Sequence, residues 1–367
     1  MKGTNRVRPE SSETRSRSSG AAGAPLLLLG FVLLAGFGFV VYLLVARGAA
    51  ERERVSEGSG GGSGQNEFAY DIKGLLAVDP SLITHDEVLS FDIGFREPRG
   101  IDVGEGDTVF VVGDSALRGY YPDGRSMTEV ELPAPPQCVD ESPAGHYHVG
   151  FRDHVEVYDS KSKLRIASWE SLGKTAVVTS IAIWKNDVYV ADAGQRVVWH
   201  YDLSGKRVGE IGRKDAARDI PGFIVPSPFL DLAVGPDGRI RVVNPGRHRI
   251  EAYSREGDLD FFWGKPSMGI EGFSGCCNPC NIALLPAGGY VTCEKGIPRV
   301  KVYDESGTLV GVVADPKRFV AGERALEEDW RRGTGGGLDV AVDSKGRILV
   351  LDPMGRNVRV FAKKKTT

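Results

Sequence analysis

The sequence lacks an excess of either charge. Its 46 Lys and Arg residues stand against 49 Asp and Glu residues, so the formal net charge is -3. A nucleic-acid-binding domain normally carries a strongly basic face. The near balance of charges therefore argues against a nucleic-acid partner.

Common catalytic signatures are also absent. The sequence contains no P-loop, no serine nucleophile elbow and no glycine fingerprint of a dinucleotide-binding fold. Only six histidines occur, and they do not recur at a repeat-equivalent position that would place three of them around a central zinc ion. These absences make catalysis the less favoured class of function.

Long apolar runs are missing except for one near the N-terminus. Residues 25–46, PLLLLGFVLLAGFGFVVYLLVA, contain no charged side chain. They have the length of a membrane-spanning helix, about 20 residues, whereas the apolar region of a cleaved signal peptide, the alternative, has only about 7–15. We therefore predict a transmembrane helix here. More basic residues precede it than closely follow it, so the N-terminus is expected in the cytoplasm.

The predicted span divides the chain into unequal parts. Residues 1–24, rich in Ser and Arg, are expected to form a disordered cytoplasmic tail, and residues 47–66 a flexible Gly- and Ser-rich linker. Residues 67–367 would then be one soluble domain in the periplasm or another extracytoplasmic space. With 48 Gly, 20 Pro and 8% aromatic residues, this chain favours short strands and turns over long helices.

A pattern of short strands repeats through the soluble part. The clearest copies align as strand, polar turn, strand, Asp/Ser-Gly turn, strand, and they begin at Asp187 (DVYVADAGQRVVWHYDLSGKRVGEIG), Arg239, Gly289 and Arg347. Another apolar run precedes each copy, and two weaker copies begin at Pro98 and Pro136, which gives six units of four strands. Radial repetition of four-stranded sheets predicts an all-β, six-bladed β-propeller.

The two ends of the repeat region predict how the ring closes. The last copy ends near Lys363 after three strands, whereas the alternating segment Glu87 to Phe95 stands alone before the first copy. We expect this segment to supply the outer strand of the sixth blade, because closure removes exposed sheet edges.

Two segments carry a family resemblance. SIAIWKNDVYVADAGQRVVWHYD and GGLDVAVDSKGRILVLDPMGRNVRVFA resemble NHL repeats, so the chain is similar, over roughly residues 95–363, to the NHL-repeat six-bladed β-propeller family of the membrane-anchored bacterial type. The resemblance implies a blade type that occurs in sensor, scaffold and a few enzyme domains. Fold alone says little about activity.

Strand geometry predicts which residues surround one mouth of the central channel. The residue before each innermost strand and the residue about 13 positions later lie at the same end of two antiparallel neighbours. These rim positions are Gly100, Cys138, Ser180, Asp231, Asn281 and Asp339, and then Asp114, Phe151, Asp192, Asn244, Glu294 and Asp352. The resemblance implies that Asp and Arg residues here tie turns together. The alternative is a ligand-binding rim made by Cys138, Asp192, Asp231, Asn281, Glu294, Arg299, Asp339 and Asp352.

Cysteine is scarce, and four of the five residues fall in one segment, GFSGCCNPCNIALLPAGGYVTCEKG. Cys280 precedes an innermost strand and Cys293 ends the next strand, so we expect them side by side, with Cys276 and Cys277 in the preceding loop. Four convergent thiolates would hold zinc or an iron–sulfur cluster. Disulfides, with Cys280 and Cys293 as the first pair, are the alternative in an oxidising compartment, and a redox-active Cys277-Asn-Pro-Cys280 pair is a third.

These features predict a membrane-tethered extracytoplasmic propeller that serves as an interaction or sensor module. Through the cysteine site it would be an accessory to a membrane redox complex, with a protein partner on the rim and the membrane bound through residues 25–46. The alternative function is a metal-dependent or redox enzyme that acts at the channel mouth.

Overall fold

The computed structural model describes residues 77–319 and 337–365. The predicted tail, membrane span and linker, residues 1–24, 25–46 and 47–66, lie outside these ranges. Within them, no helix is long and apolar enough to cross a membrane. The helices found there are single 3-10 turns, namely η1 (Pro80–Leu82), η2 (Glu105–Asp107), η3 (Pro245–Arg247) and η4 (Pro316–Phe319).

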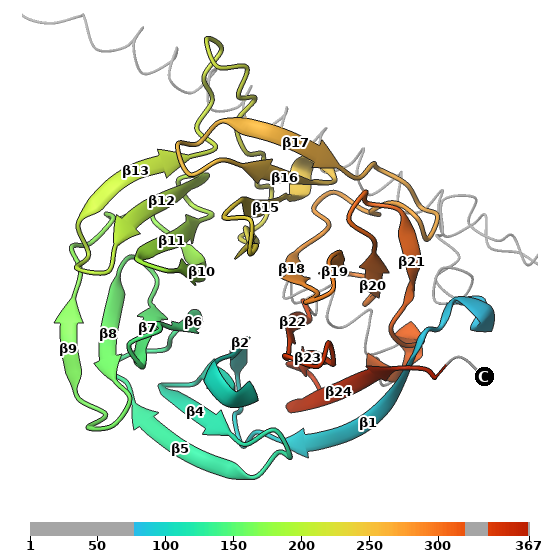
Figure 1. Cartoon of the computed structure of the whole chain (residues 1–367), viewed down its shortest axis with the longest axis horizontal. Helices are drawn as coiled ribbons and strands as arrows, with labels where there is room; N and C mark the ends of the chain where they lie inside the picture. Colours follow the sequence, from blue (N-terminus) through green and yellow to red (C-terminus); the bar gives the residue numbers. More distant parts are fainter. Residues whose placement is uncertain (1–76, 320–336, 366–367) are drawn as a thin grey trace, which may run out of the picture. The chain divides into compact units, whose positions relative to one another are not determined.

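Six four-stranded antiparallel sheets stand around a central channel, which confirms the predicted propeller (Figure 1). In blades 1 to 3 the strands run from the channel outward in chain order: β2 (Pro98–Val103), β3 (Val109–Gly113), β4 (Ala116–Tyr120) and β5 (Ser126–Glu131); β6 (Cys138–Glu141), β7 (His146–Gly150), β8 (Val155–Asp159) and β9 (Arg165–Ser168); β10 (Val178–Trp184), β11 (Asp187–Asp192), β12 (Val197–Asp202) and β13 (Arg207–Ile211).

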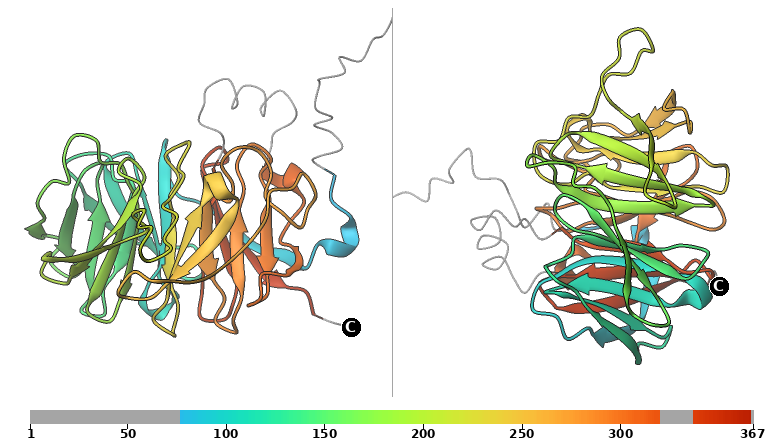
Figure 2. Two further views of the ribbon diagram at one scale, coloured as in Figure 1. Left: turned by 90° about the horizontal axis from the view of Figure 1, so that it is seen from above. Right: turned by 90° about the vertical axis from the view of Figure 1, so that its left-hand side faces the viewer.

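Blades 4 and 5 repeat this order, and blade 6 takes its outermost strand from the start of the described chain. Their strands are β14 (Leu232–Val234), β15 (Ile240–Asn244), β16 (Arg249–Tyr253) and β17 (Leu259–Trp263); β18 (Asn281–Leu284), β19 (Tyr290–Cys293), β20 (Val300–Tyr303) and β21 (Leu309–Val312); β22 (Asp339–Val342), β23 (Ile348–Asp352), β24 (Asn357–Lys363) and β1 (His85–Asp92). Seen from the side, the strands run across the thickness of the ring (Figure 2).

Burial explains the sequence pattern of each blade. The second and third strands are covered on both faces by neighbouring blades, so β11 and β23 are buried along their whole length. The outermost strands have one free edge, and β13 is mostly exposed. Each blade-to-blade contact holds its own hydrophobic cluster, such as Val157 with Val190 between blades 2 and 3. Burying one such valine contributes about 1.5–3 kcal/mol.

The closure of the ring follows the sequence prediction. Strand β1 pairs with β24 in antiparallel register, with Glu87 opposite Phe361 and Asp92 opposite Asn357. The strand ends earlier than the predicted Phe95, because Gly94 has a φ of +67° and its N–H turns back to Asp92 Oδ1 at 2.6 Å.

Candidate functional site: the central channel and the cysteine loop

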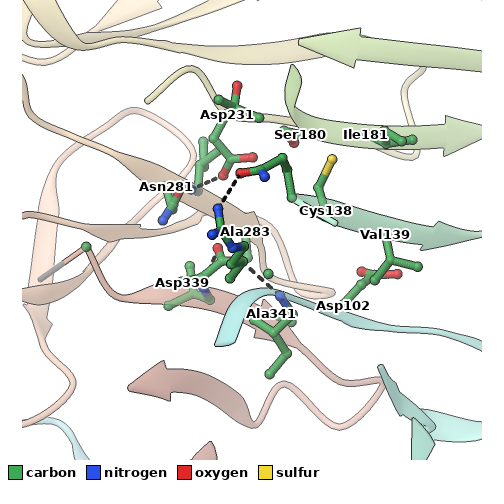
Figure 3. Close-up of a pocket in the computed structure, with 18 of the residues that line it drawn as sticks. Asp102, Cys138, Val139, Ser180, Ile181, Asp231, Asn281, Ala283, Asp339 and Ala341 are labelled. Atoms are coloured by element: carbon green, nitrogen blue, oxygen red, sulfur yellow. Dashed lines mark hydrogen bonds between the residues drawn. The ribbon is translucent and has the colours of Figure 1, made fainter. Parts of the chain in front are cut away.

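A cavity of about 880 Å³ occupies the central channel. Its wall consists of the innermost strands β2, β6, β10, β14, β18 and β22, the residues that precede them, and residues of the turn between β23 and β24. Figure 3 shows side chains from several blades turned toward this space, among them Asp102, Asp231, Asp339, Cys138 and Asn281. The predicted rim residues Cys138, Asp231, Asn281 and Asp339 therefore meet at one cavity.

Five acidic residues line the cavity: Glu97, which pairs with Arg99, and four aspartates that we call the channel acids, Asp102, Asp140, Asp231 and Asp339. Three of them accept a hydrogen bond from a backbone N–H of the following blade. The bonds run from Ile183 N to Asp140 Oδ2 (2.6 Å), from Ile282 N to Asp231 Oδ2 (2.7 Å) and from Ile101 N to Asp339 Oδ2 (3.0 Å). These acids thus hold adjacent blades in register while they remain partly exposed to the channel.

The other blade contacts have polar links of the same kind. Thr179 Oγ1 donates to Leu230 O at 2.6 Å, between blades 3 and 4, and Asn281 Nδ2 donates to Leu338 O at 2.7 Å, between blades 5 and 6. Between blades 1 and 2, Asp102 and Asp140 hydrogen-bond to each other. A polar link is therefore present at each of the six blade contacts around the channel.

Burial and mutual repulsion change the acidity of the channel acids. Burial raises the pKa of Asp102 and of Asp231 to about 6. Burial, followed by the charge of Asp231, raises the pKa of Asp339 to about 8, and burial, followed by the charge of Asp102, raises the pKa of Asp140 well above its usual value. Ionising a carboxyl group is costly at these buried positions, so Asp339 and Asp140 retain their protons near neutral pH.

Basic residues stand where β2 begins, at one end of the cavity. Arg96 and Arg99 contribute to its lining there, and Arg356, in the turn between β23 and β24, belongs to the lining as well. Arg99 is engaged with neighbours, since its guanidinium lies 3.3 Å from Glu97 Oε2 and 3.2 Å from Gln137 Oε1. The channel thus has basic groups at this end and carboxyl groups along its wall.

A second set of acidic residues lies one strand further from the axis. We call Asp192, Glu294 and Asp352 the rim acids; they are 0%, 0% and 3% exposed and do not belong to the cavity lining. Each accepts hydrogen bonds from a nearby loop. Asp192 Oδ1 accepts from Val177 N at 2.9 Å, for example, and Asp352 Oδ1 accepts from Gly355 N at 2.8 Å. This placement agrees with the turn-tying role that the family resemblance implies.

Glu294 has the most demanding environment of the rim acids. Its Oε2 accepts from Ser274 N at 2.9 Å, and its Oε1 lies 2.7 Å from Lys301 Nζ. Both charged side chains are fully buried, and Arg299, another predicted rim residue, is 3% exposed in the same blade. The structure places Glu294 and Arg299 inside the blade and away from the channel.

The cysteine loop, residues 274–280, brings two sulfurs close together. Cys276 Sγ lies 3.2 Å from Cys277 Sγ; Cys276 is exposed, whereas Cys277 is buried. Cys280 and Cys293 are adjacent, as expected, but Cys280 Sγ is directed at the carbonyl oxygen of Cys293 at 3.2 Å. The residue directly opposite Cys293 in the ladder is Asn281.

The predicted metal site requires sulfurs that converge on one point. In the part of the chain that the structure describes, no three His, Cys, Asp or Glu side chains converge as metal ligands. As placed, the four thiols therefore do not offer the set that zinc or an iron–sulfur cluster requires. A metal at Cys276, Cys277, Cys280 and Cys293 stays a prediction that metal analysis would test.

The thiols also differ in acidity. Burial opposes ionisation of Cys277, but hydrogen bonds with Ser227, Lys295 and Cys276 outweigh it and lower the pKa of this thiol. Burial raises the pKa of Cys280 and Cys293 far above the usual value. Cys280 and Cys293 therefore stay protonated at neutral pH. In the pair Cys276 and Cys277, Cys277 is the more acidic thiol, because the hydrogen bond between them raises the pKa of Cys276.

Sequence reasoning missed Asp102 and Asp140. Both lie two residues after a predicted rim position, Gly100 and Cys138 respectively. Side chains two apart on a strand share a face, so the alternation of the innermost strands was a usable signal for these channel-lining residues.

Comparison with known proteins supports the fold and nothing more specific. No family model matches the chain, so the NHL resemblance has no support from that comparison, and no curated protein matches it either. One similar solved structure is a streptogramin B lyase, with a TM-score of 0.52 and 11% identity over 78% of this chain and 100% of that chain. Another is a chain of a mitotic checkpoint complex, with a TM-score of 0.51 and 12% identity over 79% of this chain and 95% of that chain. Virginiamycin B lyase from Staphylococcus aureus is also similar (0.48, 14%, 77% and 89%). At these identities the likeness shows the β-propeller fold alone.

Proposed function

We propose that this chain is a membrane-tethered, extracytoplasmic sensor or interaction module whose central channel binds a small organic cation. The observation that carries the proposal is the set of channel acids, which lines a cavity of about 880 Å³. Ligand pockets usually measure about 300–1,000 Å³ and contain a few polar groups that fix the ligand. The membrane tether rests on the apolar run of residues 25–46.

The arrangement of the channel acids favours an extended cation over a metal ion. The four carboxyl groups come from four different blades, and in residues 77–319 and 337–365 no three potential ligands converge on one point. A metal ion needs oxygen ligands at about 2.0–2.6 Å. A di- or polyamine can instead place separate ammonium groups beside separate carboxylates. Because arginines at one end of the cavity would repel an ammonium group, the charged groups of the polyamine must lie deeper in the channel, beside the carboxylates.

The raised pKa values give the proposal a distinctive signature. A cation inside the channel favours the ionised carboxylates, so its binding would release protons from Asp339, whose pKa is about 8 in the free protein. By linkage, the affinity would rise as the pH increases from about 6 toward 8. Binding to an ordinary exposed acidic patch would show no such proton release in this pH range.

Calorimetric titration of the full-length chain in detergent with putrescine and with spermidine tests this function. We expect binding that is tighter at pH 8 than at pH 6 and is weakened by at least roughly tenfold, equal to about 1.4 kcal/mol, in the Asp231→Asn/Asp339→Asn variant. Asp123→Asn is the matched control, because Asp123 is exposed and pairs with Arg125 in a surface turn. Absence of binding, or equal binding by both variants, would refute the channel site.

Fractionation tests the location separately. We expect the protein to remain with membranes after a high-salt wash, and a reporter fused after Thr367 to behave as exported. Release of a soluble form that begins near Glu51 would show that residues 25–46 are a cleaved signal peptide, and it would leave the channel proposal intact.

The alternative function, a metal-dependent or redox enzyme or an accessory to a membrane redox complex, depends on a metal at the cysteines. Metal analysis after anaerobic purification distinguishes it. Near-stoichiometric iron or zinc, lost when Cys280 and Cys293 are both changed to Ser, would favour this alternative.

A further inference from the structure

We propose that Cys276 and Cys277 form a reversible disulfide between adjacent residues, which makes the cysteine loop a redox-modification site. Their sulfurs lie 3.2 Å apart, and a disulfide bond requires about 2.05 Å, so only a small movement separates the dithiol from the bonded form. Cys276 is exposed, which gives an oxidant access to the pair. The proposal does not depend on the channel ligand.

No other cysteine pair has comparable geometry and access. Cys280 and Cys293 are each 0% exposed, and the Cys280 sulfur points to a carbonyl oxygen. Cys138 is 7% exposed and belongs to the wall of the channel in another blade. The close sulfur pair in the structure is therefore Cys276 with Cys277, and not the Cys277-x-x-Cys280 or Cys280–Cys293 pairs weighed from the sequence.

The loop is held in place from both sides. Asn278 Nδ2 donates to Ser274 O at 2.8 Å and to Lys295 O at 3.0 Å, while Asn278 Oδ1 accepts from Lys295 N at 2.8 Å. The side chains of Ser227 and Lys295, which are joined by a bond of 2.8 Å from Lys295 Nζ to Ser227 Oγ, both hydrogen-bond to Cys277. These bonds fix the backbone around the two cysteines, so the sulfurs stay close without a large entropic cost for pairing them.

The reaction needs a disulfide oxidant, of the class of oxidised glutathione. The exposed Cys276 sulfur attacks one sulfur of the oxidant, loses its proton to water and expels one thiolate, which takes up a proton. The Cys277 sulfur then loses its proton, attacks Cys276 Sγ and expels the second thiolate. In total, two protein thiols lose two protons and two electrons, and one disulfide becomes two thiols.

Covalent geometry makes this bond easy to reduce. Adjacent Cα atoms are about 3.8 Å apart across a trans peptide, whereas disulfide-linked Cα atoms are usually about 4.4–6.8 Å apart. The bond is therefore strained, and strained, exposed disulfides have the higher reduction potentials of labile or regulatory bonds. We expect a switchable modification, in contrast to a structural crosslink.

Thiol counting and peptide mapping on the full-length chain test the proposal. The reduced protein in detergent is incubated with oxidised glutathione, alkylated after denaturation, digested and analysed by mass spectrometry. We expect the number of free thiols to fall from five to three, with the peptide that contains Cys276 and Cys277 lighter by two hydrogen atoms and restored by dithiothreitol. Three results would overturn the proposal: five free thiols after oxidation, a crosslink that joins other cysteines, or a bound metal that protects all four clustered thiols.

Variants sharpen the assignment. Cys277→Ser should trap a stable glutathione adduct on Cys276, because the resolving sulfur is gone, whereas Cys280→Ser should still form the loop disulfide and is the matched control. Thermal melting confirms that each variant is folded. Loss of the loop disulfide in a folded Cys280→Ser variant would show that the oxidised pair includes Cys280.

Discussion

The channel acids belong to the innermost strands and the rim acids to the second strands, and the environments of the two sets differ. Asp192 and Glu294 are fully buried, and their oxygens accept hydrogen bonds from their own blade and loop. Asp231 and Asp339 bond to the following blade and remain partly open to a cavity. Acids of both sets tie the structure together, but only those on the innermost strands also face the cavity, so distance from the axis decides which carboxyl groups a channel ligand could reach.

The largest expected effect concerns a rim acid. Glu294→Ala removes the partner of the fully buried Lys301 and the acceptor of Ser274 N. An uncompensated buried charge costs about 3–5 kcal/mol, so we expect the free energy of unfolding to fall by that amount in denaturant titration. Glu305→Ala, at an exposed position in the same blade, should change it by less than about 0.5 kcal/mol. A loss below about 1 kcal/mol for Glu294→Ala would remove the distinction between the two sets.

A channel acid should instead change the pH dependence of stability. The pKa of Asp339 in the folded protein, about 8, lies above its usual value of 3.8, so the folded state retains a proton that the unfolded chain releases. The resulting stabilisation is complete below about pH 4 and is lost as the pH rises toward 8, by at most about 1.4 kcal/mol per pH unit.

Asp339→Asn is the variant that measures this contribution. The amide keeps an acceptor for Ile101 N but cannot ionise. We expect the melting temperature to decrease less between pH 5 and pH 8 than in the unchanged protein, and to be higher at pH 8. If the melting temperatures of the two proteins fell by the same amount between pH 5 and pH 8, the raised pKa would not belong to Asp339.

The smallest expected effect is at Asp114, at a partly exposed rim-equivalent position. Its carboxylate accepts from Glu97 N at 2.8 Å and from Arg96 N at 3.1 Å, and its φ is +47°. Asn tolerates this backbone conformation and retains one acceptor, so Asp114→Asn should lower the free energy of unfolding by about 0.5–1.5 kcal/mol. A loss as large as that of Glu294→Ala in the same titration would mean that burial does not set the cost.

The sequence predicted the ring well because its pattern is local. Alternating apolar residues and Asp/Ser-Gly turns recur along the chain, so the six sheets and the pairing of β1 with β24 follow from the sequence. The prediction of the rim residues did not separate cavity-lining residues from buried ones. It put Asp231 and Asp192 in one set, although of these two only Asp231 lines the cavity. Sequence spacing locates the end of a strand, but the blade's radial packing decides where a side chain points.

The cysteine cluster shows the same limit. Spacing correctly placed Cys280 beside Cys293, because both lie at the same end of neighbouring strands. It could not show that Cys276 and Cys277 form a separate close pair, since that depends on the path of an irregular loop and on the bonds of Asn278. Loop conformations are set by such individual contacts, which leave no periodic signal.

The pairing of β1 with β24 also has a consequence for synthesis on the ribosome. Glu87 and its partner Arg359 are 272 residues apart, so at about 5–20 residues per second the closing strand waits on the order of tens of seconds for its neighbour. During that time β1 has no partner in its own sheet and could pair with another nascent chain. It contains three acidic residues, Asp86, Glu87 and Asp92. Charged side chains discourage edge-to-edge association, so these residues would protect the closing strand until the end of the chain emerges.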